Sequence, residues 1–227
     1  MRILPSITTT KGSDWRAKIK EADELGIKEV CFFLTCLDLE ERKEFYELVG
    51  NSKIKSSPFI HIRNDLKEWE LDFLIEKYRT KVFNIHCNVE YPLINDYYFK
   101  KYKDRIFIEN IYSPLNEEEL KIFGGICLDF THLENDRLMN PEKYKHNLEI
   151  LDKFKIGCNH ISAIKKDLHE DAYGKEYRYD MHSFEDLSEF DYLKNYPKKY
   201  FSDFVALELE NSLADQLRAK EYIIGFF

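Results

Sequence analysis

Residues 105–132 read RIFIENIYSPLNEEELKIFGGICLDFTH, and their pattern decides the fold. Two apolar, β-branched runs, Arg105–Ile111 and Gly125–Phe130, are typical of buried strands. Between them, Glu117–Phe123 spaces its apolar residues along one face of a helix. A strand, a helix and a second strand in this order predict a βαβ unit, in which the two strands run parallel.

The same alternation continues in both directions along the chain. Six further runs predict strands, at Ile3–Ile7, Glu29–Leu34, Phe59–Ile62, Val82–Cys87, Gly157–Ala163 and Phe204–Leu209. Five further segments predict covering helices, at Trp15–Leu25, Leu39–Val49, Trp69–Tyr78, Pro141–Phe154 and Leu213–Ile223. Eight strands alternating with helices predict a single (β/α)8 TIM barrel over residues 1–227. A doubly wound sheet is less consistent with the sequence, because the first strand runs into PSITTTKG and not into a glycine-rich phosphate turn.

Composition limits the classes of function. The chain of 227 residues is 44% hydrophobic and carries a formal net charge of −8, which argues against a non-specific nucleic-acid coat or a polybasic membrane binder. No apolar run approaches the roughly 18 residues of a membrane span, and no signal-peptide core is present, so we expect a soluble, cytoplasmic protein without membrane contact. The five cysteines form no C-x-x-C pair, which predicts reduced and mostly buried thiols. The longest stretch predicted to be irregular is Lys165–Asp180.

Polar side chains gather where the predicted strands end, which is where barrel enzymes place their active sites. Imidazoles and carboxylates together suit zinc, manganese or a similar divalent ion. Five imidazoles and four carboxylates exceed the needs of one ion, so they predict two or three ions with positions left for water and substrate. These nine candidate metal ligands are His61, His86, Glu109, Asp129, His132, His160, Asp180, His182 and Glu208.

The motifs around these residues resemble the endonuclease IV branch of the xylose-isomerase-like barrels. Residues 124–132, GGICLDFTH, are similar to that family's G-x-C-hydrophobic-D-x-x-H strand. The remaining matches are His61 and His86 at the two early histidines, Ile108-Glu109-Asn110 at I-E-N, His160-Ile161, Asp180-Met181-His182 at D-x-H, and Leu207-Glu208 at the final L-E.

The resemblance implies a trinuclear zinc centre that hydrolyses a DNA phosphodiester beside an abasic sugar. In that arrangement His61 and His86 hold one ion, and Glu109 bridges it to a second. The second ion is completed by Asp129, His160 and Glu208, and the third ion is held by His132, Asp180 and His182. Glu109 and Glu208 are the implied catalytic residues, with Glu208 positioning the attacking water.

Two departures from the family pattern reduce the expected grip on DNA. The strand end at His86 reads His-Cys-Asn where the family has H-P-G, and His61 is followed by Ile-Arg-Asn without the family's aromatic residue. The segments joining the third predicted strand to the fourth and the fourth to the fifth are also short, and in the family such loops bind DNA. The expected substrate is therefore a phosphodiester, either abasic DNA or a smaller molecule.

Two other classes of function stay open. The same superfamily contains sugar and sugar-phosphate isomerases and epimerases, which bind one divalent ion through Glu, Asp, His and Glu; Glu109, Asp129, His160 and Glu208 satisfy that pattern, with manganese as a further candidate ion. A metal-binding module without catalysis is the third reading. Glu210 shares a strand face with Glu208, so the strand-eight ligand is open between the two.

Overall fold

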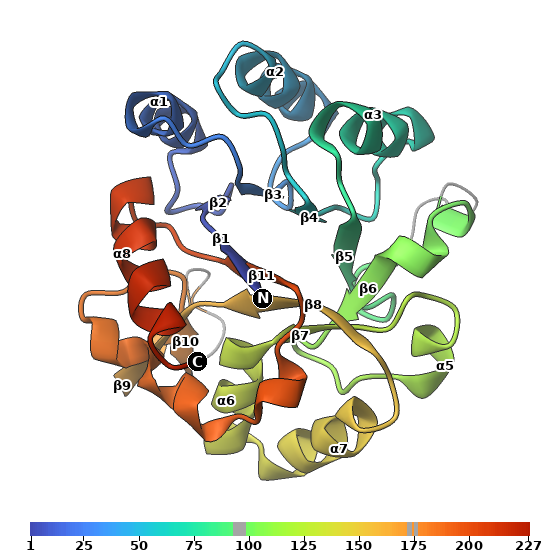
Figure 1. The fold of residues 1–227 in the computed structure, drawn as a ribbon. Coiled ribbons are helices and arrows are strands. Elements are labelled where there is room, and N and C mark those ends of the chain that lie inside the picture. The colour runs from blue at the N-terminus through green and yellow to red at the C-terminus, as the bar shows by residue number, and fades with distance from the viewer. Residues whose placement is uncertain (93–98, 172–173, 175–176) are drawn as a thin grey trace.

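In the computed structural model, parallel strands form one curved sheet with the helices outside it (Figure 1). The structure describes residues 1–92, 99–171, 174 and 177–227. The strands of this sheet are β1 (Arg2–Leu4), β2 (Ser6–Ile7), β3 (Cys31–Phe33), β4 (Phe59–His61), β5 (Val82–His86), β6 (Ile106–Glu109), β7 (Ile126–Asp129), β8 (Ile156–Ile161) and β11 (Phe204–Leu207). They fall on the eight predicted strands, so the prediction of an α/β TIM barrel is confirmed.

The first predicted strand is divided in two at Pro5. Proline has no N–H to donate to a ladder, so the strand changes partner at this residue. Before it, β1 pairs in parallel with β11; after it, β2 pairs in parallel with β3. The sheet order β1-β11-β8-β7-β6-β5-β4-β3-β2 therefore closes the ring through the two halves of one strand.

The buried side chain of Gln216 joins the two ends of this ring. It accepts a hydrogen bond from the backbone N–H of Ser6 at 2.6 Å and donates to the carbonyls of Ser6 and Leu209, each at 3.1 Å. An unpaired backbone group costs stability when it is buried. Gln216 thus supplies the partners that the break at Pro5 removes.

Six helices lie where the sequence predicts them. They are α1 (Trp15–Leu25), α2 (Leu39–Gly50), α3 (Glu68–Tyr78), α5 (Glu117–Leu120), α7 (Pro141–Leu151) and α8 (Leu213–Ile224). Helix α1 shows why these segments are helical. Trp15, Ile19 and Ala22 share its buried face, and the Asp14 side chain caps its first turn by accepting a hydrogen bond from the N–H of Ala17. Helices α5 and α7 end at Leu120 and Leu151, earlier than predicted.

Helix α6 (Phe130–Met139) was not predicted from the sequence. It begins directly after β7, and the Asp129 carboxylate caps it by accepting from the N–H groups of Thr131 and His132, at 2.7 and 2.8 Å. Its buried face includes Glu134 and Asp136, which bind Arg137 and Lys143. Because its buried positions are partly charged, the helix lacks the apolar stripe that marks the other helices.

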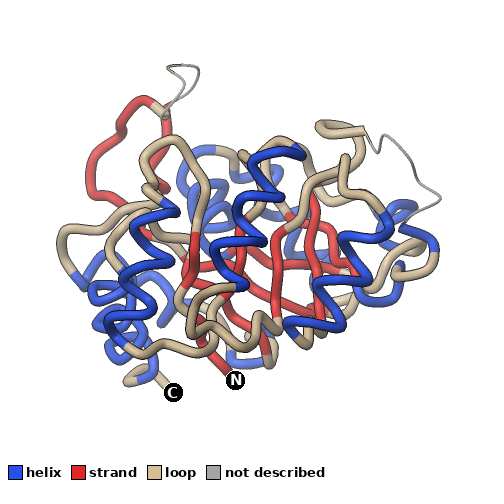
Figure 2. Tube along the Cα trace, turned by 90° about the horizontal axis from the view of Figure 1, so that it is seen from above, coloured by secondary structure: helices blue, strands red, loops and turns tan. Residues whose placement is uncertain are grey.

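The prediction that Lys165–Asp180 is irregular was wrong. Residues on either side of the tip form an antiparallel hairpin of β9 (Ala163–Glu170) and β10 (Tyr177–Met181). Figure 2 shows it projecting from the end of the barrel opposite the two termini. Exposed charged residues such as Lys166 and Asp167 occupy positions that are apolar in a core strand, which concealed the strand pattern.

Short 3-10 segments complete the chain at η1 (Lys103–Arg105), η2 (Leu187–Asn195) and η3 (Lys198–Tyr200). Among the described residues no helix combines the length and apolar character needed to cross a bilayer. All five cysteines are free, and four of them are buried, as predicted.

Candidate metal centre

Six of the nine candidate ligands converge at the carboxyl-terminal ends of the central strands. His61, His86, Glu109 and Asp129 are the last residues of β4, β5, β6 and β7, His160 lies in β8, and Glu208 follows β11. Since parallel strands of a barrel end at the same mouth, their terminal side chains share one small volume. We call the volume defined by these six residues the candidate metal centre.

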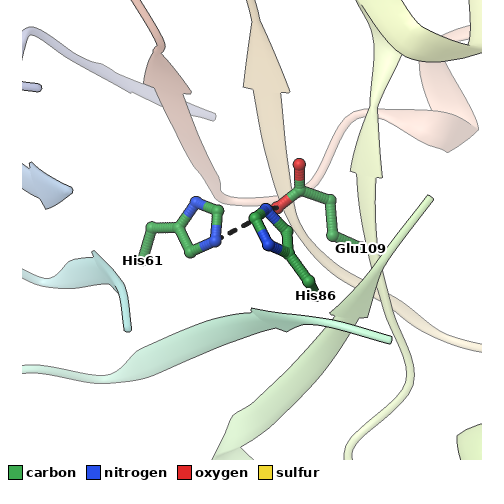
Figure 3. Close-up of side chains that lie close together, drawn as sticks. All are labelled: His61, His86 and Glu109. Carbon is green, nitrogen blue, oxygen red and sulfur yellow. Dashed lines mark ion pairs between the residues drawn. The ribbon is translucent and has the colours of Figure 1, made fainter. Parts of the chain in front are cut away.

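Glu109 faces two histidines on one side. His61 Nε2 lies 3.6 Å and His86 Nε2 lies 4.0 Å from Glu109 Oε2. Figure 3 shows both imidazoles beside the Glu109 carboxylate. The ligand atoms of these three residues, the histidine group, all lie within 4.8 Å of one another, which is compatible with a common metal ion.

Glu109 also belongs to a second cluster, the four-residue group of Glu109, Asp129, His160 and Glu208, whose ligand atoms likewise lie within 4.8 Å of one another. His160 Nδ1 lies at its middle, 3.4 Å from Glu109 Oε2, 3.3 Å from Glu208 Oε2 and 3.9 Å from Asp129 Oδ2. Two groups that share Glu109 could hold two ions with that carboxylate between them.

Both groups contain buried polar atoms that lack a hydrogen-bond partner, as is expected of residues that bind a divalent cation. Both ring nitrogens of His61, both of His160, Asp129 Oδ2 and Glu208 Oε2 are buried without a hydrogen-bond partner. Buried polar atoms normally have partners, and a bound cation would supply the partners that this cluster of atoms lacks. Three carboxylates enclosed together also need positive charge nearby.

The protonation states agree with metal binding. Burial lowers the pKa of His61 to about 3, so at neutral pH its imidazole is uncharged, which is the form that binds metals. Burial raises the pKa of Asp129, and the neighbouring Glu109 and Glu208 carboxylates add to this effect. A divalent ion would relieve that repulsion and keep Asp129 ionised.

The other three candidate ligands, His132, Asp180 and His182, are arranged differently. His132 Nδ1 lies 2.8 Å from Asp180 Oδ2, and Arg178 binds both oxygens of that carboxylate. His132 Nε2 faces the centre instead, 3.8 Å from both Glu109 and Asp129. His182 lies 3.7 Å from Glu208. The third ion that the resemblance implies stays a prediction, and Arg178 already places a positive charge on Asp180.

Two asparagines that the sequence analysis did not select support the ligands. Asn84 Nδ2 donates to Glu109 Oε2 at 2.6 Å, and the Asn110 side chain exchanges hydrogen bonds with the backbone N–H and carbonyl of Asp129. Asn84 is a polar residue within an otherwise apolar strand, two positions before His86. That spacing places it on the ligand face and was the signal available in the sequence.

The structure separates Glu208 from Glu210. Glu208 is buried and contributes to the four-residue group, whereas Glu210 accepts hydrogen bonds from Thr10 Oγ1 at 2.6 Å and from the Gly12 N–H at 3.2 Å. Glu210 therefore lies at the rim of the barrel mouth, bound to the loop that follows β2.

A cavity of about 430 Å³ opens above the candidate metal centre. Its walls include His86, Glu109 and Glu208, and the β9–β10 hairpin forms one side through residues 169–171, 178 and 180–182. The lining also carries positive side chains and exposed aromatic rings, namely Lys11, Arg63, Arg178, Tyr91 and Tyr112. This volume lies in the range of pockets that bind small molecules.

Comparisons with known proteins identify the fold. No protein-family model and no curated protein matches the sequence. Among solved structures, the chain is similar to a xylose isomerase-like TIM barrel protein from Mycobacterium smegmatis in complex with magnesium, with a TM-score of 0.55, 12% identity, and coverage of 99% of this chain and 95% of that one.

Two further solved structures are less similar to this chain. One is a xylose isomerase domain-containing protein from Salmonella typhimurium LT2, with a TM-score of 0.49, 13% identity, and 98% and 94% coverage of this chain and that one. Another is an uncharacterised protein from Parabacteroides distasonis, with a TM-score of 0.49, 13% identity, and 97% coverage of both chains. The strand order of the sheet and the likeness to the Mycobacterium smegmatis protein define the chain as an α/β TIM barrel.

Proposed function

We propose that the protein is a metal-dependent phosphodiester hydrolase with chemistry like that of endonuclease IV. The observation that supports this best is the sharing of Glu109 between the histidine group and the four-residue group. A carboxylate between two ions is the arrangement of many enzymes that hydrolyse phosphate esters. Divalent ions bound there would supply Lewis-acid activation of water and stabilise the charge that develops on the phosphate.

The chain's own residues provide the remaining parts. Glu208 is buried at the cavity floor, and although burial opposes ionisation, His182 and His160 hold its pKa at about 2, so it is a carboxylate at neutral pH. Its Oε2 has no hydrogen-bond partner and is available to orient a water molecule. Arg178 and Lys11 line the same cavity and offer positive charge to a phosphate.

We further propose that the substrate is a small phosphodiester rather than a long DNA duplex. The net charge of −8 opposes wide contact with a polyanion, and the β9–β10 hairpin forms a wall of the cavity. A small molecule with one phosphodiester needs only the positive side chains that line the cavity, such as Arg178 and Lys11. An abasic-site duplex remains the comparison substrate.

The test combines metal analysis with activity. Protein purified without chelator and reconstituted with Zn²⁺ should bind more than one equivalent and hydrolyse bis(4-nitrophenyl) phosphate faster than it cleaves an abasic-site duplex. Glu210→Gln serves as the control, because Glu210 lies outside both ligand groups. Reconstituted protein that is inert on every phosphodiester would overturn the proposal.

The four-residue group favours a second candidate, a sugar or sugar-phosphate isomerase that uses one ion. These residues form a complete ligand set without His61 and His86, and the Mycobacterium smegmatis neighbour is described as a magnesium complex. In such an enzyme Glu109 and Glu208 would transfer the proton between adjacent carbons. Exchange of the C2 proton of a ketose or aldose with solvent, retained when His61 and His86 are both replaced by alanine, would favour this candidate over the hydrolase.

A further inference from the structure

The barrel interior directly beneath the candidate metal centre contains three thiols. Cys31, Cys127 and Cys158 are each 0% exposed and pack with Phe33, Phe59 and Phe107 in one interior cluster, so all three point inward. Two of them lie in strands that carry candidate ligands two residues further on: Cys127 precedes Asp129 in β7, and Cys158 precedes His160 in β8.

The strand register brings one of these thiols level with a ligand. In the β6–β7 pair Glu109 lies opposite Cys127, whereas in the β7–β8 pair Asp129 lies opposite His160. The β7–β8 register shifts between Ile126 and Cys127. As a result, ligand atoms of Glu109, Cys127 and His160 lie within 4.8 Å of one another.

His160 gives a second, independent indication of a ligand. It is fully buried, its ring stacks with those of Phe59 and His61, and neither of its ring nitrogens has a hydrogen-bond partner. A buried imidazole with both nitrogens unsatisfied is unusual in a packed interior. Beside a thiol and a carboxylate, it completes a mixed N, O and S donor set.

We propose that Glu109, Cys127 and His160 form a second binding site for a thiophilic divalent ion. This deep site lies further inside the barrel than the oxygen-rich outer site, which is formed by the four-residue group. Thiolate ligands select ions such as Cd²⁺ and Zn²⁺, whereas carboxylates suit Mg²⁺ and Mn²⁺. On binding, the Cys127 S–H bond breaks, the sulfur bonds to the ion through its electron pair, and the proton is released to solvent.

The two sites share Glu109 and His160, so two ions cannot both be fully coordinated at the same time. A thiophilic ion in the deep site therefore removes two ligands from the four-residue group. The choice of metal would then decide which site is filled, and Cd²⁺ would inhibit an enzyme that works with an ion in the outer site. This inference concerns metal binding and is independent of the reaction that the centre catalyses.

Spectroscopy of the metal-free full chain titrated with Cd²⁺ tests the proposal without any substrate. The titration uses a Cys36→Ser background, because Cys36 is exposed and lines the same cavity. We expect charge-transfer absorption from sulfur to cadmium, which stops increasing when the deep site is full. Excess Mn²⁺ should weaken this absorption, because it competes for the shared ligands. Adding Cys127→Ser should abolish this absorption and weaken Cd²⁺ binding by about tenfold or more. Adding Cys158→Ser, at the paired position in β8, should leave both unchanged.

X-ray absorption of the cadmium-loaded Cys36→Ser protein gives a readout that needs no Cys127 variant. A sulfur atom in the first coordination sphere is expected. Coordination by nitrogen and oxygen alone, absorption that survives Cys127→Ser, or absorption lost only in Cys158→Ser would each overturn the proposal.

Discussion

The guanidinium of Arg178 holds both oxygens of the Asp180 carboxylate, with Nε 2.7 Å from Oδ1 and Nη2 2.8 Å from Oδ2. Nη2 also lies 3.1 Å from His132 Nδ1. Burial would raise the pKa of Asp180, but His132 and Arg178 outweigh burial and hold it well below its usual range. Arg178 thus carries a positive charge from strand β10, one residue from the tip of the hairpin, to the cavity wall.

Replacing this guanidinium should impair phosphodiester hydrolysis. We expect Arg178→Met to lower kcat/KM on bis(4-nitrophenyl) phosphate by about 10- to 100-fold, because a charge-assisted hydrogen bond contributes about 1.5–3 kcal/mol. Arg178→Lys keeps the charge but not the two-pronged contact and should fall between the two. Unchanged kinetics, with the metal content also unchanged, would show that Arg178 only orients Asp180.

The comparison of Glu208 with Glu210 tests the assignment of the carboxylates. Glu208→Gln preserves the shape but removes the charge, so we expect activity to fall about 100-fold or more, as when other electrostatic groups are removed from active sites. Glu210→Gln should stay within about fivefold of wild type, because contacts at the rim contribute about 1 kcal/mol or less. Steady-state kinetics of the two variants, with circular dichroism to verify folding, gives the answer. A larger loss in Glu210→Gln would reverse the assignment.

Metal stoichiometry tests the sharing of Glu109. Glu109→Ala removes a ligand from both groups and should lower the number of bound zinc ions more than His86→Ala, which leaves the four-residue group intact. Elemental analysis of reconstituted proteins after gel filtration measures this difference. Equal losses in the two variants would contradict the shared carboxylate.

The junction at Pro5 predicts a large effect on stability. Gln216→Leu keeps a side chain of similar size but leaves the Ser6 N–H without its partner, so we expect the free energy of unfolding to fall by about 2–4 kcal/mol. Arg218→Ala, on an exposed position of the same helix, should change it by about 0.5 kcal/mol or less. Urea denaturation measures both variants, and equal effects would rule out a special role for Gln216.

Lys18 should make stability depend on pH. Burial lowers its pKa to about 8, although Glu210 and Glu21 favour the charged form, and its Nζ donates to Thr8 Oγ1 at 2.8 Å and to the Leu209 carbonyl at 2.6 Å. Between about pH 8 and pH 10.5 the unfolded chain binds more protons at this residue than the native protein does, so this residue's contribution to stability rises with pH.

Lys18→Met should lack this rise, whereas Lys20→Met, at an exposed position, should retain it. The measurement is the difference in unfolding free energy between each variant and the wild type, at about pH 7 and at about pH 10. A Lys18→Met difference that is constant across this range would contradict the lowered pKa.

The barrel could be predicted because each strand and most helices repeat the same local signals. Apolar runs indicate strands, and capping residues with apolar residues on one face indicate helices. Both signals lie within a few residues of sequence, so they can be recognised without knowing the tertiary structure. Helix α6 and the β9–β10 hairpin lack these signals. Glu134 and Asp136 are buried because the fold brings the Tyr196 hydroxyl to Glu134 and Lys143 of the next helix to Asp136. The hairpin is paired although much of it faces solvent.

The candidate centre could be predicted as a set of residues but not as a geometry. Strand ends meet at one mouth, so His61, Glu109 and Glu208 could be grouped from the sequence. Side-chain packing decides that Arg178 contacts Asp180 and that Asn84 donates a hydrogen bond to Glu109. The stagger of the strands decides that Cys127 lies opposite Glu109. Neither property follows from a local sequence pattern.

The divided first strand has a consequence for the order of events during synthesis. Arg2–Leu4 is made before the other strands of the barrel, yet its partner Phe204–Leu207 is made only after all of them. Until then one edge of β8 and one edge of β1 have no neighbour, and unpaired edges are prone to intermolecular pairing. Until this last strand completes the ring, the growing barrel therefore carries two open strand edges at which other chains can pair.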